Sequence, residues 1–453
     1  MLSRKNVDAT RGAVLPLIIT YSVPLIIGNL IQNVFNMIDI AVLGNMADTG
    51  AVASVGATST IISLIVNAIV NLSSGTKILL ARQIGMKDSR QIRRTVDSSI
   101  VTALTLGCVV AFLGYLLAPL FLTITRCPAD CFEGASLYLR IYVLSAPAIF
   151  VYNFGSSVIM TSGDTKRPLY YILASGLLNV ILNIVLCVIL PQKVIAVAVA
   201  TVASQVLGAV LVMIRLCRMN DDMRVDLKRL KPSFESFVKI IRYGLPVAIY
   251  QAFYPLANLQ IQSNINDYGL AAIAGNSAAV TIEGMIASFH SGFCTTVLTF
   301  MGQNIGAEKP DRVKKVFYTC LWIAPLICGS IGILVFLSGR FWLSLILGSD
   351  LIAIGYGLRR LLFVGGFYFV ASFGGVFGYS IQAFGYTIFN ALNSAICTLL
   401  FRVFWMNVIY PEFKTFDCIM LCFTVSWTLG CIFNIIAYSI IKMRYNKGKY
   451  KMI

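Results

Sequence analysis

Long stretches of mainly apolar residues recur along the whole 453-residue chain, and they limit its possible folds more than any other feature. Stretches such as 14–43, 100–124 and 169–190 are each long enough to cross the roughly 30 Å hydrocarbon core of a bilayer as a helix. Only 12% of the residues are charged, which is about half the share in a typical soluble protein. The chain is therefore predicted to be an integral membrane protein, and a soluble enzyme is excluded.

Hydropathy along the chain predicts about twelve membrane-spanning helices, so the expected fold class is an all-α membrane protein. An even number of spans places both termini on the same side of the membrane. The predicted spans lie near 14–44, 50–80, 96–125, 137–162, 169–191, 194–217, 238–266, 269–303, 316–339, 358–384, 388–410 and 416–441.

Basic residues are concentrated on one side of this arrangement. The chain has 36 Lys and Arg against 19 Asp and Glu, a formal net charge of +17. Most of the basic residues fall in the tails and in the loops on the side of the termini. The positive-inside rule then predicts a plasma-membrane protein with cytoplasmic termini, whose basic loops contact anionic lipid headgroups rather than nucleic acid. The first apolar stretch contains Pro16 and Pro24 and lacks a small-residue cleavage site, so we expect a retained helix and not a signal peptide.

Short motifs recur in the same order at offsets of 219 to 222 residues. The recurring pairs include Tyr21-x-x-Pro24 with Tyr243-x-x-Pro246, Ala53-x-x-Gly56 with Ala272-x-x-Gly275, and Gly163-x-Thr165 with Gly385-x-Thr387. We therefore predict two pseudo-symmetric six-helix bundles: an N-lobe at 1–220, a cytoplasmic linker at 221–237 and a C-lobe at 238–453. Because six is even, the halves enter the membrane the same way round and would enclose a central cavity, an architecture that favours transport by alternating access.

Two acidic residues, Asp39 and Glu283, are predicted at membrane depth, where a carboxylate is costly unless it is paired, protonated or hydrated. Asp39 ends a polar stripe on one face of the first span. The functional interpretation is a proton or cation site that lines the first lobe; the alternative is a polar helix-packing seam. The stripe comprises Asn29, Gln32, Asn33 and Asn36, and Asn179, Asn183 and Thr201 on the next spans could complete the site.

Glu283 lies seven residues from both Asn276 and His290, near one face of the eighth span. It is either part of a proton or cation site, or an acid paired with a neighbouring helix, and His290 is better explained as a packed core residue. Arg402 has no partner that the sequence reveals. Further cavity-lining candidates on the seventh span, for which helix packing is an equal alternative, are Gln251, Tyr254, Asn258 and Gln262.

Pro24 and Pro246 occupy equivalent places in the first helix of each half. A proline inside a helix removes one hydrogen bond and bends the helix, which membrane proteins tolerate where neighbours or cavity water satisfy the backbone. We expect a hinge at Pro24, because Asp39 lies on the same helix. For Pro246 a hinge and a static kink remain equally possible.

The chain offers little for metal, cofactor or enzyme chemistry. It has a single His, and its 12 Cys lie mostly within or beside predicted spans, where a thiol acts as a small apolar group. Only Cys127 and Cys131 share an outer loop, a spacing that hints at a disulfide. The absence of a G-x-x-x-x-G-K-[ST] phosphate loop argues against an ATP-driven pump. We therefore predict no metal, no cofactor and no enzymatic activity.

Several segments together resemble the bacterial branch of the multidrug and toxic compound extrusion (MATE) family. They are Pro24 through Asn33-x-x-Asn36-x-x-Asp39 to Gly44, Ala81-Arg82-x-x-Gly85, Ser162-Gly163-Asp164-Thr165 and the Gly302 to Ala307 segment. The resemblance implies a monomer of two bundles forming a V-shaped cavity, which exports organic cations and other amphipathic compounds in exchange for protons or sodium. It makes Asp39 the family's first-helix acid, Pro24 its bend, and Asn179 and Thr201 part of its first-lobe polar network.

The sequence also departs from the family pattern. Many relatives have an acid at Asn183, and the sodium-linked branch has acids at the positions aligned with Tyr254 and Ala371. Glu283 instead resembles the eighth-span acid of the other bacterial branch. With fewer acidic oxygens to hold a cation, proton coupling is favoured over sodium. The alternative function is a flippase for a lipid-linked or amphipathic substrate, although few Lys or Arg are available to hold a pyrophosphate in the cavity.

Overall fold

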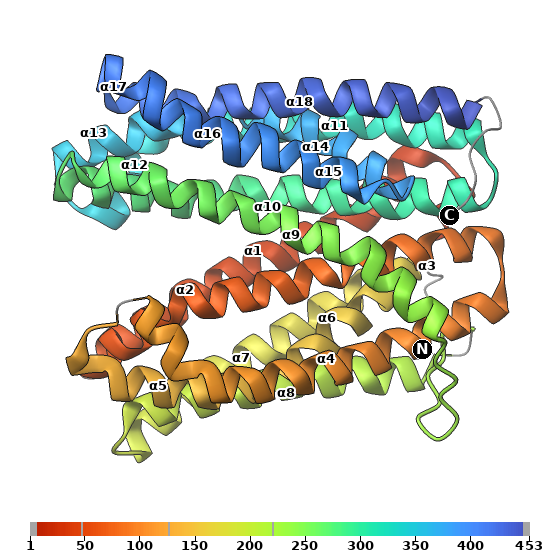
Figure 1. Ribbon diagram of the computed structural model, residues 1–453, viewed down its shortest axis with the longest axis horizontal. Coiled ribbons are helices and arrows are strands. Elements are labelled where there is room, and N and C mark those ends of the chain that lie inside the picture. The colour runs from red at the N-terminus through yellow and green to blue at the C-terminus, as the bar shows by residue number, and fades with distance from the viewer. Residues whose placement is uncertain (1–6, 47–48, 126, 220–221, 447–453) are drawn as a thin grey trace. The chain divides into compact units, whose positions relative to one another are not determined.

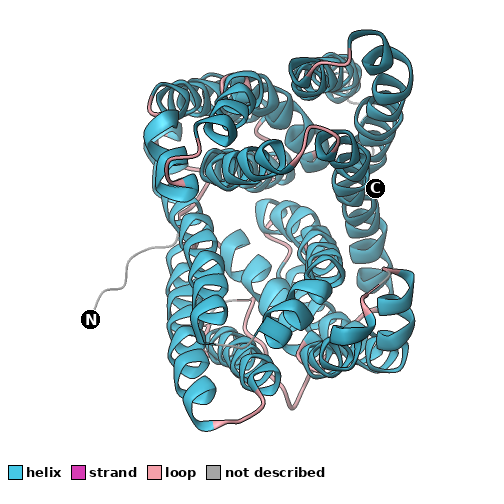
Figure 2. Ribbon diagram, turned by 90° about the vertical axis from the view of Figure 1, so that its left-hand side faces the viewer, coloured by secondary structure: helices cyan, strands magenta, loops and turns pink. Residues whose placement is uncertain are grey.

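The computed structural model describes residues 7–46, 49–125, 127–219 and 222–446. These residues form helices joined by short loops, and none of them lies in a strand (Figures 1 and 2). The fold is all-helical, as the sequence predicts. Within this part of the chain, ten helices are long and apolar enough to cross a membrane, or eleven if one bent pair counts as a single span.

The helices of the first half are α1 (Val14–Met46), α2 (Thr49–Leu72), α3 (Ser74–Met86), α4 (Ser89–Ile124), α5 (Ala129–Val143), α6 (Ala146–Thr161), α7 (Lys166–Ile189) and α8 (Lys193–Cys217). Those of the second half, with η for π-helical segments, are α9 (Phe234–Asn266), α10 (Leu270–Gly306), α11 (Pro310–Leu337), α12 (Gly339–Leu347), α13 (Leu351–Arg360), η1 (Leu361–Gly365), α14 (Tyr368–Ala383), α15 (Thr387–Asn393), η2 (Ser394–Leu400), α16 (Phe401–Phe404), η3 (Trp405–Ile409), α17 (Tyr410–Phe413) and α18 (Phe416–Asn446).

Two predicted spans differ from continuous apolar helices. The span expected at 137–162 is divided into α5 and α6, which are bent by 44° at the break. Pro147 lies in the first turn of α6 and has no backbone N–H to continue the hydrogen-bond ladder, which accounts for the break. The span expected at 238–266 forms α9, whose Gln and Asn side chains keep it below the hydropathy of the other spans.

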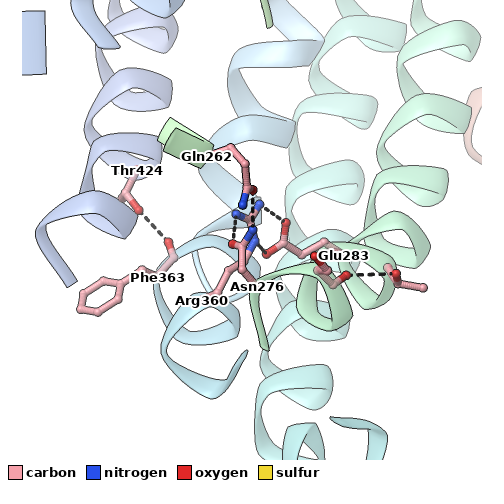
Figure 3. Close-up of polar contacts among 8 residues, drawn as sticks. Gln262, Asn276, Glu283, Arg360, Phe363 and Thr424 are labelled. Carbon is pink, nitrogen blue, oxygen red and sulfur yellow. Dashed lines mark hydrogen bonds and ion pairs between the residues drawn. The ribbon is translucent and has the colours of Figure 1, made fainter. Parts of the chain in front are cut away.

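The spans expected at 358–384 and 388–410 contain π-helical segments, in which each hydrogen bond reaches one residue further than in an α-helix. Such turns leave backbone carbonyl groups that need other partners. The carbonyl oxygen of Phe363 in η1 accepts a hydrogen bond from Thr424 Oγ1 in α18 at 2.6 Å (Figure 3). Hydropathy does not predict these segments, because it does not depend on the hydrogen-bond register.

The chain divides into two compact units that do not coincide with the predicted lobe boundaries. The first unit contains the described residues up to Asp8 and Ile27–Ala248, and the second contains Ala9–Ile26 and the described residues from Ile249 onward. The opening part of α1 thus belongs to the second unit, and the opening part of α9 to the first. In the first unit α4 packs against α6, and α7 against α8; in the second, α14 packs against α10, α11 and α18.

The repeated Tyr-x-x-Pro motifs lie just before the two points, within α1 and α9, where the chain passes from one unit to the other. Pro24 is two residues before the end of the segment Ala9–Ile26, and Pro246 is two residues before Ala248. Tyr21 belongs to the second unit, where its hydroxyl group donates a hydrogen bond to Thr299 Oγ1 at 3.2 Å. Tyr243 belongs to the first unit, where its ring centroid lies 6.0 Å from the Arg82 guanidinium. Each tyrosine therefore anchors its helix end in the unit formed mainly by the other repeat.

The segment predicted as a linker at 221–237 is held against α4 where it is described. Asp97 Oδ2 accepts a hydrogen bond from the backbone N–H of Lys231 at 3.0 Å. Ser98 Oγ accepts one from the backbone N–H of Ser233 at 2.8 Å. Helix α9 begins at Phe234, within the predicted linker, so the connection is shorter and more ordered than its polar composition indicates.

A close approach of α10 and α13 leads to a first prediction. A Cβ atom at Gly275 would lie 2.1 Å from the carbonyl oxygen of Ala353, so the backbones must separate to admit it. Gly275→Ala is expected to destabilise the protein by about 1–3 kcal/mol, as overpacking does. Gly56→Ala, at the equivalent place in the first repeat, is the matched control, because nothing lies within 4 Å of its added Cβ. Thermal unfolding of the purified variants measures both, and equal midpoints would contradict the prediction.

Candidate functional site

The Asp39 carboxylate on α1 lies against two amide side chains one turn apart on α7. Asn183 Nδ2 donates a hydrogen bond to Asp39 Oδ1 at 3.1 Å. The Asn179 amide fits the carboxylate with its nitrogen facing Asp39, at 2.6 Å from Oδ1 and 3.1 Å from Oδ2. Asn179 and Asn183 are 6% and 2% exposed, so the carboxylate meets a rigid, buried pair of donors. The structure thus brings together three of the residues that the sequence singles out in the first lobe.

Thr201 on α8 belongs to the same neighbourhood through Tyr138, a residue that the sequence analysis missed. Tyr138 is buried on α5, is hydrogen-bonded to Thr201 and interacts electrostatically with Asp39. Ser204 Oγ, one turn after Thr201, lies 3.4 Å from the other end of the Asn179 amide, which is its oxygen when the nitrogen faces Asp39. A tyrosine in an apolar helix is a weak signal by itself, because such a residue usually only packs. Its position becomes informative once α5 is placed beside α8.

The chemistry of this group suits a small cation. Asp39 forms no ion pair with a basic residue within the described part of the chain. Its partners are neutral amides, so the carboxylate keeps its full charge available for a proton or a positively charged ligand. Asn183 Oδ1 is buried without a hydrogen-bond partner and offers a second oxygen. Carboxylate and amide oxygens are hard donors of the kind that bind hard cations.

The polar stripe that leads to Asp39 along α1 is only partly covered by neighbouring helices. Gln32 and Asn36 are exposed, and Asn33 and Asp39 are half-buried. A helix-packing seam would bury these side chains against another helix, so their exposure favours the interpretation as a polar lining.

Glu283 on α10 is paired with an arginine of α13. Arg360 Nε and Nη2 donate hydrogen bonds to Glu283 Oε1 and Oε2, each at 2.9 Å (Figure 3). Arg360 Nη1 also donates to Asn276 Oδ1 at 2.8 Å, and Asn276 Nδ2 donates to Gln262 Oε1 at 3.1 Å. Glu283 and Arg360 are 7% and 5% exposed. Of the two possibilities for Glu283, the structure shows the acid paired with a neighbouring helix.

Arg402 on α16 is fully buried and contacts only uncharged side chains. Its Nη1 donates a hydrogen bond to Asn258 Oδ1 at 2.8 Å, and its Nε donates to Ser426 Oγ at 3.1 Å. Its guanidinium carbon lies 4.8 Å from the ring centroid of Tyr254 and 4.6 Å from that of Phe423. The predicted polar face of α9 therefore meets a buried cation through Tyr254 and Asn258, a contact that the sequence does not reveal.

The remaining candidates have other surroundings. His290 packs against Cys294, whose sulfur lies 3.7 Å from Nε2, and against the ring of Tyr368, as expected of a core histidine. Gln251 is half-buried on α9. Cys127 and Cys131 are free thiols with their sulfur atoms 3.7 Å apart, so the hinted disulfide is not formed.

Comparisons with known proteins agree with the repeat. The model of the MatE family matches two segments of the chain, residues 24–185 and 246–406. The segments begin at the two equivalent prolines, Pro24 and Pro246. The first contains the Asp39 group, and the second contains Glu283 with the buried Arg360 and Arg402.

Curated relatives include the probable multidrug resistance protein YpnP of Bacillus subtilis, 26% identical over 80% of this chain and 81% of its own. The multidrug export protein MepA of Staphylococcus saprophyticus is 22% identical over 71% of each chain. Among solved structures, a MATE protein in its straight conformation gives a TM-score of 0.89 at 20% identity, covering 98% of this chain and 100% of that one. A transporter of the MOP superfamily from Pyrococcus furiosus matches with the same score and coverage. These structures share the two-lobed helical fold of the chain.

Proposed function

The chain belongs to the MatE family of membrane transporters, which are not enzymes, and from this premise we propose that it is a secondary active multidrug efflux antiporter. In this proposal it exports organic cations and other amphipathic compounds in exchange for protons, with sodium the less favoured ion. Its relatives include a probable multidrug resistance protein and a multidrug export protein, which supports drugs as the substrates.

The observation that carries the proposal is the unpaired carboxylate of Asp39 between two amides of α7. A carboxylate held only by neutral donors has one charge for which a proton and a cationic drug compete. In the ionised form it attracts the drug, and protonation from the acidic outside removes that attraction and favours release. Alternating access then couples the entry of the proton to the exit of the drug, with Pro24 as the hinge that lets α1 move. Gln32, Asn33 and Asn36 would line the polar approach to the acid.

Glu283 is less suited to this exchange than Asp39. Its charge is already compensated by the two hydrogen bonds from Arg360, so a proton would have to compete with a buried guanidinium. We therefore assign the coupling proton to Asp39 and regard Glu283, with Asn276 and Gln262, as a fixed network in the second unit. Among the described residues, Asp39 is the one carboxylate at the site in the first unit, which favours a proton over a sodium ion.

The test is transport by the purified protein in sealed phospholipid vesicles. A fluorescent organic cation is expected to move against its own gradient when a pH gradient is imposed, because inward proton flow drives its exit. A sodium gradient without a pH difference is expected to give no movement above protein-free vesicles. Export under the sodium gradient alone would identify sodium, and not the proton, as the coupling ion. If no tested cation moves under either gradient, the export proposal is wrong.

The proposal also assigns an orientation and a state of assembly. We propose a monomer in the plasma membrane with both termini in the cytoplasm, where the basic loops contact anionic headgroups. Labelling with a reagent that does not cross the membrane distinguishes the two orientations, with Cys127 or a single cysteine introduced in a tail as the target, in a chain whose other cysteines are replaced by Ser.

A further inference from the structure

The second unit carries an excess of buried positive charge. Among its described residues, the buried charged side chains are Glu283, Arg360 and Arg402. Glu283 and Arg360 neutralise each other through two hydrogen bonds. The guanidinium of Arg402 has no carboxylate to balance it. Burying a charge is unfavourable unless it is paired, so this arginine needs a compensating role.

The surroundings of Arg402 are only partly suited to a cation. Its Nη2 is buried without a hydrogen-bond acceptor in the described part of the chain, although Nε and Nη1 are satisfied. The Phe423 ring is shared between two cations, because the Arg360 guanidinium carbon also lies 4.9 Å from its centroid. The ring therefore does not stabilise Arg402 alone. One donor of the guanidinium fork is thus available to a further acceptor, and a carboxylate oxygen is a strong one.

Both buried arginines lie beside irregular turns of the backbone. Arg402 is in the four-residue α16 between the π-helical segments η2 and η3, and Arg360 directly precedes η1. Segments of this kind are rare and are frequently found at functional sites. Their occurrence next to both buried arginines favours a binding role over simple packing.

Tyr254 is the group that separates Arg402 from the surroundings of the second unit. Its ring lies against the guanidinium, yet the residue is 37% exposed. Asn258, one turn further along α9, already places a neutral oxygen on Nη1. A ligand would reach the guanidinium from this side only if the Tyr254 side chain rotated away from it. An aromatic ring at the entrance also provides a surface for the apolar part of such a ligand.

We infer that Arg402, covered by Tyr254 and positioned by Asn258, forms a subsite in the second unit for the carboxylate of an amphipathic aromatic substrate. The inference rests on the proposed export function and specifies its substrate class: amphipathic aromatic compounds that carry a carboxylate as well as a cationic group. Arginine suits this role better than lysine, because its planar fork matches the two oxygens of a carboxylate.

Equilibrium binding to the purified protein tests the subsite without any ion gradient. The probes are dansylglycine and its methyl ester, which differ only in the carboxylate, and binding is followed by the fluorescence of the dansyl group. The native protein is expected to bind dansylglycine about tenfold more tightly than the ester, as a charge-assisted hydrogen bond predicts. Equal affinity for the two probes would overturn the inference, and this comparison needs no variant.

Variants then locate the effect. Arg402→Gln is expected to remove the preference for the carboxylate, and Arg402→Lys to keep part of it because the charge remains. Arg359→Gln is the matched control, since its side chain is exposed and adjacent to Arg360. A full preference retained in Arg402→Gln would overturn the inference. Because binding is measured without transport, a protein that binds the carboxylate but exports no cation would contradict the proposed export function and leave the subsite intact.

Discussion

Asp39→Asn is expected to abolish efflux driven by a pH gradient, reducing the rate to that of protein-free vesicles. The asparagine keeps the size of the side chain but cannot ionise, so neither a proton nor a cationic drug gains from its charge. The measurement is the initial rate of export of a fluorescent organic cation from reconstituted vesicles under an imposed pH gradient.

Asp130→Asn is the control for this experiment. Asp130 is an exposed acid in the first turn of α5, in the same unit but away from the amide pair. Its substitution is expected to leave the export rate unchanged. Gradient-driven export by Asp39→Asn at the native rate would show that another group carries the coupling ion. Loss of export in both variants would indicate a general effect of removing acids.

Glu283→Gln is expected to lower the free energy of unfolding by about 3–5 kcal/mol, the usual cost of leaving one partner of a buried ion pair unpaired. The variant leaves the buried Arg360 charge without a carboxylate, with only neutral acceptors for its guanidinium protons: Asn276 Oδ1 and the single amide oxygen of the introduced glutamine. The measurement is the thermal unfolding midpoint of the purified protein in detergent, compared with the native chain. An unchanged midpoint would mean that water or another acceptor reaches Arg360.

Two further variants distinguish the loss of the Glu283–Arg360 ion pair from the general effect of removing a charged side chain. Glu283→Gln combined with Arg360→Gln is expected to recover part of the loss, because no unpaired charge then remains. Arg359→Gln removes an exposed partner of Asp417, 3.6 Å away, and is expected to cost less than about 1 kcal/mol. A double variant less stable than Glu283→Gln would show that the two side chains do not compensate each other.

The all-helical fold and the first-lobe group follow from features that the sequence displays directly. Apolar stretches predict the spans, and the repeated motifs predict two related halves. Asp39, Asn179 and Asn183 could be grouped because each is a polar side chain within an apolar helix, where few roles are possible. Their spacing places the two asparagines on one face of α7. These are local properties, so no knowledge of helix packing was needed.

The second unit was less predictable because its contacts join distant parts of the chain. Arg360 lies at the start of the span expected at 358–384, where a basic residue normally reaches the membrane surface, and its partner Glu283 is 77 residues away. Arg402 and Asn258 are 144 residues apart. Neither pairing leaves a periodic signal in the sequence. The break between α5 and α6 and the π-helical segments also depend on local hydrogen bonding rather than hydropathy.

The exchange of helix ends between the two units determines the order in which the protein can complete its fold during synthesis. Ala9–Ile26 is made first, yet it belongs to the unit formed from Ile249 onward, which is made last. The unit formed by Ile27–Ala248 is incomplete until the opening turns of α9 have been made. Neither unit can therefore close around its core when only the first repeat has left the ribosome. A chain divided between its repeats would leave each fragment without the helix end that completes it.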